Sequence, residues 1–199
     1  GETFSSVLKK YKLELYDFNH DNFRLDKKSY GIDRNHELVI FAALKKLTNS
    51  LDHAPCFLEI GTYAGSSLIP ARVANEDSRI ITIDIEDPIL YKSQDKKKIE
   101  FIKKVRTKNV KTTRSKLILK DSLSFEWEAS MPYDLILIDG DHSIPRVDID
   151  IYNAFKFISN NGIIIVDDIQ EFSIYNFFRG ITTDLRLMAT KELTKKYDY

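Results

Sequence analysis

The sequence has little of what defines several classes of protein. It contains one cysteine, Cys56, among 199 residues, so no disulfide forms within the chain, and a reducing compartment such as the cytoplasm is expected. No apolar run approaches the roughly 20 residues that span a bilayer, and no signal-peptide pattern opens the chain. The four histidines lack partner cysteines, which argues against structural zinc. These absences predict a cytoplasmic protein without membrane segments.

Net charge is also absent, because Lys+Arg and Asp+Glu number 30 each. A neutral chain argues against a protein that coats nucleic acid, which usually needs a strongly basic face. Between residues 92 and 116, however, eleven basic residues stand against two acidic ones. The favoured interpretation of this segment is a solvated helix face, and an anion-binding or RNA-binding patch is the alternative.

No internal repeat or low-complexity linker divides the chain, and 43% hydrophobic residues suffice for one globular domain. Short runs rich in Ile, Leu and Val alternate with helical patterns at residues 94–107 and 145–159. Nearly continuous apolar runs are typical of strands buried on both faces. The predicted strands are residues 56–60, 79–84, 116–120, 133–139 and 162–167. This alternation predicts an α/β, Rossmann-like, doubly wound and mostly parallel sheet of order 3-2-1-4-5.

Further elements are expected before and after these five strands. Residues 34–51 have a helical apolar pattern, and we expect residues 1–50 to form a helical lid or extension before the 51–199 cofactor-binding unit. Asn160-Asn161-Gly162 predicts a helix stop and a tight turn. After the fifth strand we expect a helix at 171–179, and the alternation of Leu185, Leu187 and Ala189 predicts one or two edge strands.

In doubly wound sheets, ligands bind beyond the carboxyl ends of the strands. The first strand runs into Glu59-Ile60-Gly61-Thr62-Tyr63-Ala64-Gly65-Ser66-Ser67, where two glycines permit a sharp turn and Ser66 or Ser67 can cap the next helix. The loop is neither G-x-G-x-x-G nor a phosphate-binding loop. Asp84 ends the second strand, where an acid can accept hydrogen bonds from both ribose hydroxyls, or simply cap the strand. Asp121 follows the third and suits an adenine amino group or a helix N-cap.

These residues resemble the successive cofactor motifs of class I S-adenosylmethionine (SAM)-dependent methyltransferases, over residues 30–170. In that family the glycine loop passes beside the methionine moiety, the acid of the second strand holds the ribose, and the acid of the third faces adenine. The cofactor-binding set that the resemblance implies is Glu59, Gly61, Thr62, Tyr63, Gly65, Ser66, Asp84, Asp121, Ser122 and Asp139.

Three carboxylates follow the fourth and fifth predicted strands: Asp139, Asp167 and Asp168. Adjacent strand ends bring them together, and their mutual repulsion favours a divalent cation such as Mg²⁺ over the alternative of helix capping or contact with the SAM amino group. His142 lies three residues after Asp139. An unperturbed imidazole titrates at about pH 6.5, so this side chain is a candidate general base, with Asp141 orienting it or solvated.

Ile-Asp-Gly-Asp-His at 138–142 together with Val-Asp-Asp at 166–168 resembles metal-dependent O-methyltransferases, notably those acting on macrolide sugars, and cephalosporin-hydroxylase-like proteins. The resemblance implies Mg²⁺ on Asp139, Asp167 and Asp168, and catalysis by His142 and Asp139. We therefore expect a transferase that methylates the hydroxyl of a small molecule or sugar, alone or as a homo-oligomer. The alternatives are a non-catalytic SAM or nucleoside binder, a nucleic-acid methyltransferase using residues 92–116, and a nicotinamide-dependent oxidoreductase.

Overall fold

The computed structural model of the protein describes residues 34–88, 95–128, 132–143 and 145–167. Its strands are β1 (Cys56–Ile60), β2 (Arg79–Asp84), β3 (Lys116–Leu119), β4 (Tyr133–Ile138) and β5 (Ile158–Val166). Its helices are α2 (Arg34–Ser50), α3 (Leu68–Ala74), α4 (Lys96–Thr112), the short 3-10 helix η2 (Ser122–Ser124) and α5 (Arg146–Phe157). None of these helices is long and apolar enough to cross a membrane.

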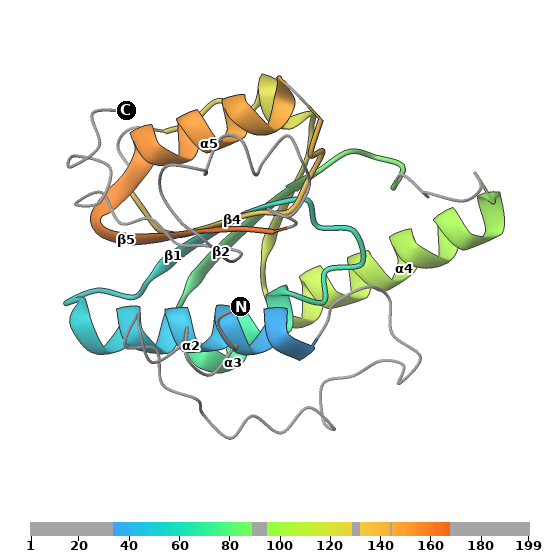
Figure 1. Ribbon diagram of the computed structural model, residues 1–199. Helices are drawn as coiled ribbons and strands as arrows, with labels where there is room; N and C mark the ends of the chain where they lie inside the picture. The colour runs from blue at the N-terminus through green and yellow to red at the C-terminus, as the bar shows by residue number, and fades with distance from the viewer. Residues whose placement is uncertain (1–33, 89–94, 129–131, 144, 168–199) are drawn as a thin grey trace.

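All five strands run parallel in one sheet of order β3-β2-β1-β4-β5, which confirms the predicted Rossmann-like fold. Helices α2, α3 and α4 lie on one side of the sheet and α5 lies on the other (Figure 1). The strand order reverses between β1 and β4, and ligands of doubly wound sheets bind beside that reversal. The predicted edge strands and the predicted helix at 171–179 fall outside the described residues.

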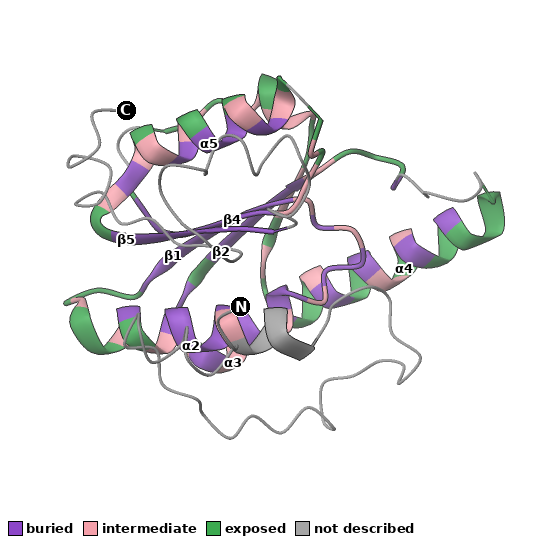
Figure 2. Ribbon diagram, viewed as in Figure 1, coloured by how far each residue is buried: buried purple, intermediate pink, exposed green. Residues whose placement is uncertain are grey.

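The apolar runs form strands because both faces of the sheet are covered. Every residue of β1 and of β4 is buried. Neighbouring positions of a strand face opposite sides, so Phe57 joins the core under α2 and α3, whereas Leu58 joins the core under α5. The buried sides of α2 and α5 face the sheet (Figure 2). Cys56 is part of the core, and burial raises the pKa of its thiol to about 11, which disfavours the reactive thiolate at neutral pH.

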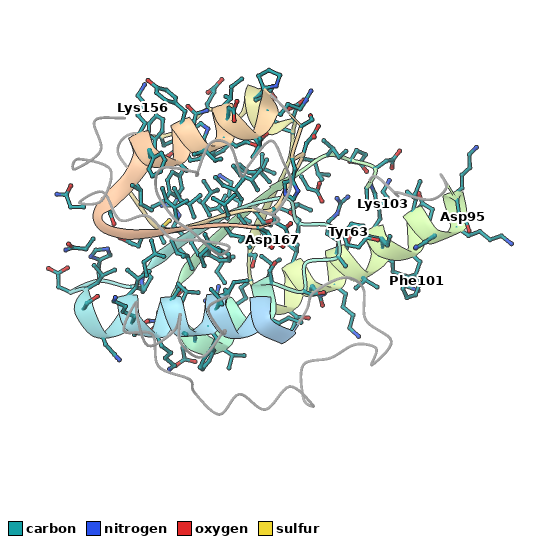
Figure 3. All side chains as sticks on the ribbon, in the orientation of Figure 1. Tyr63, Asp95, Phe101, Lys103, Lys156 and Asp167 are labelled. Atoms are coloured by element: carbon teal, nitrogen blue, oxygen red, sulfur yellow. The ribbon has the colours of Figure 1, made fainter. Side chains whose placement is uncertain are left out.

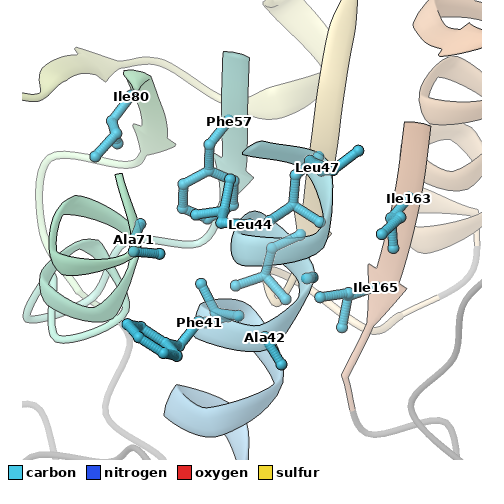
Figure 4. Close-up of a cluster of buried hydrophobic side chains, with 14 of the residues drawn as sticks. Phe41, Ala42, Leu44, Leu47, Phe57, Ala71, Ile80, Ile163 and Ile165 are labelled. Atoms are coloured by element: carbon cyan, nitrogen blue, oxygen red, sulfur yellow. The ribbon is translucent and has the colours of Figure 1, made fainter. Parts of the chain in front are cut away.

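Helix α2 confirms the predicted helix and is part of the core. Its side chains Ile40, Phe41, Ala43, Leu44 and Leu47 are buried. Figure 4 shows several of them packed against side chains of the sheet and of α3. The first 33 residues of the expected lid lie outside the described part of the chain.

The predicted turn at residues 160–162 is wrong. These residues belong to β5, which begins at Ile158 instead of Gly162, and α5 correspondingly ends at Phe157. Ile158 is fully buried and pairs with Tyr133, after which the register shifts so that Leu135 pairs with Ile163. Burial of Ile158 favours this bulged strand over a turn. A Cβ at Gly162 would lie 2.5 Å from Cγ1 of Ile158, so any larger residue there would have to displace the buried Ile158 side chain.

Helix α4 begins at Lys96 and extends five residues beyond its predicted end, to Thr112. Asp95 caps its first turn by accepting a hydrogen bond of 2.9 Å from the amide of Lys97. Asn109, a polar residue in the extension, is buried on the same helix as Ile99, Ile102 and Arg106. An apolar pattern alone underestimates the length of a helix whose buried side includes polar residues.

Candidate functional site

A row of hydrogen bonds aligns the residues that follow the strands at the carboxyl edge of the sheet. Each residue that directly follows β1, β4 or β5 donates its backbone amide to a carbonyl of the neighbouring strand. The pairs are Gly61 with Ile83 at 2.9 Å, Asp139 with Ile60 at 2.8 Å, and Asp167 with Ile138 at 3.0 Å. The predicted glycine turn and two of the predicted metal ligands therefore start from adjacent positions on one edge.

The loop after β1 turns tightly and passes close to the loop after β4. Gly61 has a φ of +94°, and Tyr63 and Gly65 also have positive φ. A Cβ on Gly61 would lie 2.0 Å from the carbonyl oxygen of Asp139, so only glycine fits. The amide of Gly65 donates to the carbonyl of Thr62 at 2.6 Å, which closes the turn. The sharp turn at the two glycines is as predicted, whereas the close contact with the backbone of Asp139 was not predicted.

Glu59 lies beneath this loop, not on its surface. The residue is 1% exposed, and its carboxylate accepts hydrogen bonds from the hydroxyls of Ser67 and Thr82. Thr82 is also hydrogen-bonded to Thr62. Burial raises the pKa of Glu59 to about 7, against the opposing effect of its two hydroxyl donors. Glu59 thus joins β1, β2 and the start of α3.

Ser67 therefore does not cap α3 with its side chain, contrary to one of the two predicted options. It occupies the N-cap position but makes no side-chain capping bond, because its hydroxyl is used by Glu59. Ser66 lies beside it at the surface of the loop and is partly exposed.

Asp84 faces the glycine loop from the end of β2. Its Oδ2 accepts a hydrogen bond of 2.8 Å from the amide of Tyr63, and its Oδ1 accepts one of 2.8 Å from the amide of Ile85. Arg106 of α4 contacts the same Oδ2 at 3.0 Å. The structure thus brings together Tyr63 and Asp84, two residues of the predicted cofactor-binding set. Arg106 was missed, because it is one of eleven basic residues in a segment interpreted as a solvated face.

Asp121 follows β3 and is a helix cap in this structure. It accepts a hydrogen bond of 3.0 Å from the amide of Leu123, at the start of η2. Nη1 of Arg146, from α5, lies 2.9 and 2.8 Å from its two carboxylate oxygens. Arg146 and the capping bond hold the pKa of Asp121 below its usual range. The neighbouring Ser122 donates to buried Asp150 at 3.1 Å.

Asp139 and His142 lie together at the end of β4. Nε2 of His142 is 4.0 Å from Oδ1 of Asp139, and their side chains are 10% and 34% exposed. Asp141 accepts a hydrogen bond of 2.9 Å from the amide of Ser143, and its other oxygen lies 3.5 Å from Nε of Arg146. A hydrogen bond from the side chain of Ser143 is the largest cause that lowers the pKa of Asp141, and the bond from its backbone amide adds a smaller lowering. Asp141 is thus engaged by its own loop and by α5.

The described residues provide two of the three predicted metal ligands. Asp167 is 7% exposed and directly follows β5 (Figure 3), next to the strand that leads into Asp139. Asp168 lies outside the described residues. Within residues 34–167, excluding the undescribed gaps, no group of three or more His, Cys, Asp or Glu side chains is placed to hold a metal ion. The metal site therefore stays a prediction.

The segment that forms this edge of the sheet matches a known protein family. Residues 58–169, more than half of the chain, match a family described as "Methyltransferase domain". The chain belongs to that family. This range begins within β1, includes β2 to β5, and contains Asp139, Asp167 and Asp168. A search of curated proteins found no significant match.

Solved structures with the same fold are methyltransferases or cofactor-bound proteins. Precorrin-6y C5,15-methyltransferase from Geobacter metallireducens GS-15 is 15% identical, with a TM-score of 0.56 over 84% of this chain and 79% of that one. Cofactor-bound Rv0187 from MTB is 17% identical, with a TM-score of 0.54 over 98% and 84%. The O-methyltransferase TomG from Streptomyces achromogenes, solved with SAM, is 15% identical, with a TM-score of 0.52 over 98% and 82%. The chain is a methyltransferase domain, and its fold is that of the class I SAM-dependent enzymes.

Proposed function

We propose that this protein transfers the methyl group of SAM to a hydroxyl oxygen of a small molecule or sugar, with Mg²⁺ bound near the acceptor. The observation that supports this most strongly is the alignment of Gly61, Asp139 and Asp167 along one sheet edge. That alignment puts a cofactor loop beside carboxylates and an imidazole. A donor and an acceptor that meet there would be within reach of both.

The cofactor half of the proposal rests on the loop after β1 and on Asp84. The glycine turn lets the backbone approach a ligand, and Asp84 stands at the end of the neighbouring strand with its carboxylate toward that turn. A carboxylate at this position suits ribose hydroxyls. Asp121 and Ser122 follow the next strand, where adenine would lie in this arrangement.

The acceptor half rests on Asp139, Asp167 and Asp168. Carboxylate oxygens are the ligands that Mg²⁺ prefers, and the two described aspartates follow neighbouring strands. The donor chemistry therefore fits Mg²⁺, with Asp168 as the third proposed ligand. When bound, the ion would lower the pKa of an acceptor hydroxyl and hold it in place.

His142 is proposed as the general base. Its Nε2 lies 4.0 Å from Asp139, so an acceptor hydroxyl held near Asp139 would be within reach of the ring. In the reaction, the hydroxyl oxygen forms a bond to the methyl carbon while the carbon–sulfur bond breaks and sulfur keeps the electron pair. The proton of the hydroxyl passes to His142, and the products are the methyl ether and S-adenosylhomocysteine (SAH). Alignment of donor and acceptor contributes about 7–11 kcal/mol to lowering such barriers.

A methyl-transfer assay tests the proposal. The protein is incubated with methyl-labelled SAM, Mg²⁺ and a library of sugars and phenols, and products are identified by mass spectrometry. We expect label on an ether oxygen of at least one hydroxyl compound and matching release of SAH. Label found only on nitrogen, carbon or nucleic acid, or SAM bound without transfer to any acceptor class, would contradict O-methylation.

A further inference from the structure

Arg106 is a buried cation inside a helix whose other basic residues are solvated. It is 2% exposed, although it lies in the most basic segment of the chain. Its Nη1 donates to Oδ2 of Asp84 at 3.0 Å and to the carbonyl of Ile85 at 2.9 Å, and its Nη2 donates to the carbonyl of Glu86 at 2.7 Å. Burial of a guanidinium is costly unless it is paired. This one is paired with the predicted ribose acid and with the turn that follows it.

Lys103, one turn earlier on α4, shows the contrast. It pairs with Glu86 at 3.0 Å and Asp87 at 2.9 Å, both of which are largely exposed. These acids belong to the turn after β2, not to the glycine loop, and neither is Asp84. Figure 3 labels Lys103 on this helix. Both cations hold the turn after β2, but Arg106 alone of the two contacts the carboxylate that faces the cofactor loop.

Asn109 extends the same contact to the glycine loop. It is 3% exposed, and its Nδ2 donates to the carbonyl of Ala64 at 2.9 Å. Arg106 and Asn109 are three residues apart, so they lie on one side of α4. This side of the helix therefore fixes both the predicted ribose acid and the loop that faces it.

Arg106 occupies one of the hydrogen-bond acceptor positions of the Asp84 carboxylate. A carboxylate has about four lone-pair positions, two on each oxygen. Oδ2 receives two donors, the amide of Tyr63 and the guanidinium of Arg106. Oδ1 receives one, the amide of Ile85. The described contacts leave Asp84 one acceptor position, on Oδ1.

We propose that Arg106 is a positioning residue of the cofactor site, and that it restricts Asp84 to one of the two ribose hydroxyls. The inference rests on the proposed binding of SAM. It replaces the sequence-based expectation that Asp84 accepts from both hydroxyls. Arg106 occupies one carboxylate oxygen and thereby presents the other to the ligand in a fixed direction.

Calorimetric titration of the full chain with SAH and its 2′-deoxy and 3′-deoxy analogues tests the restriction. Each analogue is titrated into the wild-type protein and into Asp84→Ala, as a double-mutant cycle. We expect one analogue to lose at least about tenfold in affinity in the wild type and to lose nothing further in Asp84→Ala, as for a charge-assisted hydrogen bond. The penalty for removing the other hydroxyl should be the same in both proteins. If both analogues couple to Asp84, or neither does, the restriction is wrong.

Two variants of Arg106 test the positioning role. In Arg106→Met, Asp84 loses the guanidinium that fixes the direction of its carboxylate, so SAH should bind at least about fivefold more weakly. Oδ2 also regains an acceptor position, so both hydroxyls should couple to residue 84. Arg106→Lys should recover part of the affinity, and it gives the same test if the methionine variant does not fold. Lys103→Met, which removes a cation from the same helix and turn, should bind SAH like the wild type. A folded wild type that binds no SAH would refute the proposed function, whereas SAH binding that Arg106→Met and Arg106→Lys leave unchanged would refute this inference alone.

Discussion

Gly61 packs against the backbone of Asp139, so the cofactor loop and the proposed acceptor site are in direct contact. A Cβ at position 61 would lie 2.0 Å from the carbonyl oxygen of Asp139 and 2.5 Å from its carbonyl carbon. Because both contacts are with backbone, a flexible side chain cannot move aside to relieve them. The position of one loop therefore determines the position of the other.

Gly61→Ala should accordingly destabilise the protein. The substitution adds the backbone clash to a φ of +94°, which L residues rarely adopt, and the two together should cost about 2–4 kcal/mol. Chemical denaturation measures the loss. Gly140→Ala is the matched control, because the nearest atom to its Cβ would be a side-chain methyl of Ile60 at 3.2 Å, and the backbone atoms nearby are at ordinary contact distances of 3.8 and 3.9 Å. It should cost less than about 1 kcal/mol. Equal losses for the two variants would show that the contact with Asp139 does not constrain the loop.

His142→Ala should separate chemistry from binding. If His142 removes the acceptor proton, the variant should slow methyl transfer by about 10²–10⁴-fold while it binds SAM as the wild type does. Single-turnover rates and calorimetric affinities give the two quantities. Ser143→Ala, in the same loop, loses the hydroxyl that interacts with Asp141 but keeps the backbone amide bond to it. It should transfer at close to the wild-type rate, because Ser143 is given no part in the proposed proton transfer. A His142→Ala enzyme with the wild-type rate would show that His142 is not the general base.

Chelation tests the proposed metal. If Asp139, Asp167 and Asp168 hold Mg²⁺, EDTA should abolish methyl transfer without releasing SAM, and added Mg²⁺ should restore the rate. Asp167→Asn should raise the Mg²⁺ concentration that gives half of the maximal rate, because a neutral amide is a weaker ligand for a hard cation than a carboxylate. Full activity in EDTA would exclude a metal-dependent mechanism.

The opposite edge of the sheet contains a pH-sensitive contact. His53 lies 2.9 Å from Asp52 and 3.2 Å from buried Asp134, which also accepts a hydrogen bond of 2.9 Å from the amide of Cys56. The hydrogen bond with Asp52, followed by that with Asp134, raises the pKa of His53. Because the pKa of His53 is higher in the folded than in the unfolded protein, protonation of His53 stabilises the folded state. This stabilisation is fully present below the unfolded-state pKa of about 6.5 and is lost as the pH rises through the folded-state pKa.

His53→Gln should therefore lower the free energy of unfolding most at acidic pH. Denaturation of wild type and variant at about pH 5.5 and about pH 8.5 gives the comparison, and the difference between them should shrink toward the alkaline end. High salt should reduce it at pH 5.5, because the imidazole is half exposed. A difference that grows with pH would contradict the assignment.

The sheet and the cofactor loop could be predicted from sequence because both have local patterns. The runs of Ile, Leu and Val that form β1 and β4 are buried on both faces, and Gly61 with Gly65 indicates a turn. The β5 bulge could not be predicted, because Asn160-Asn161-Gly162 has the composition of a turn and only the pairing of distant Tyr133 with Ile158 keeps it in a strand.

The basic partners of the site acids likewise could not be predicted from the sequence. Arg106 stands among lysines that are solvated, and nothing local distinguishes the one cation that faces inward toward Asp84. Asp121 contacts Arg146, which is 25 residues later in the sequence, because α5 packs beside η2. Contacts of this kind depend on tertiary packing, so residue types and spacing predicted the acids but not the cations that hold them.

Calorimetric titration of SAM into the wild-type protein and into Asp84→Ala tests most directly whether this edge of the sheet is a SAM site. The wild type should bind one SAM per chain. Asp84→Ala should bind at least about tenfold more weakly, because a charge-assisted hydrogen bond contributes about 1.5–3 kcal/mol. Asp87→Ala, in the same turn but paired with Lys103 at the surface, should bind like the wild type. A folded wild type that binds no SAM, or an Asp84→Ala variant with undiminished affinity, would contradict the assignment of the cofactor site to this edge.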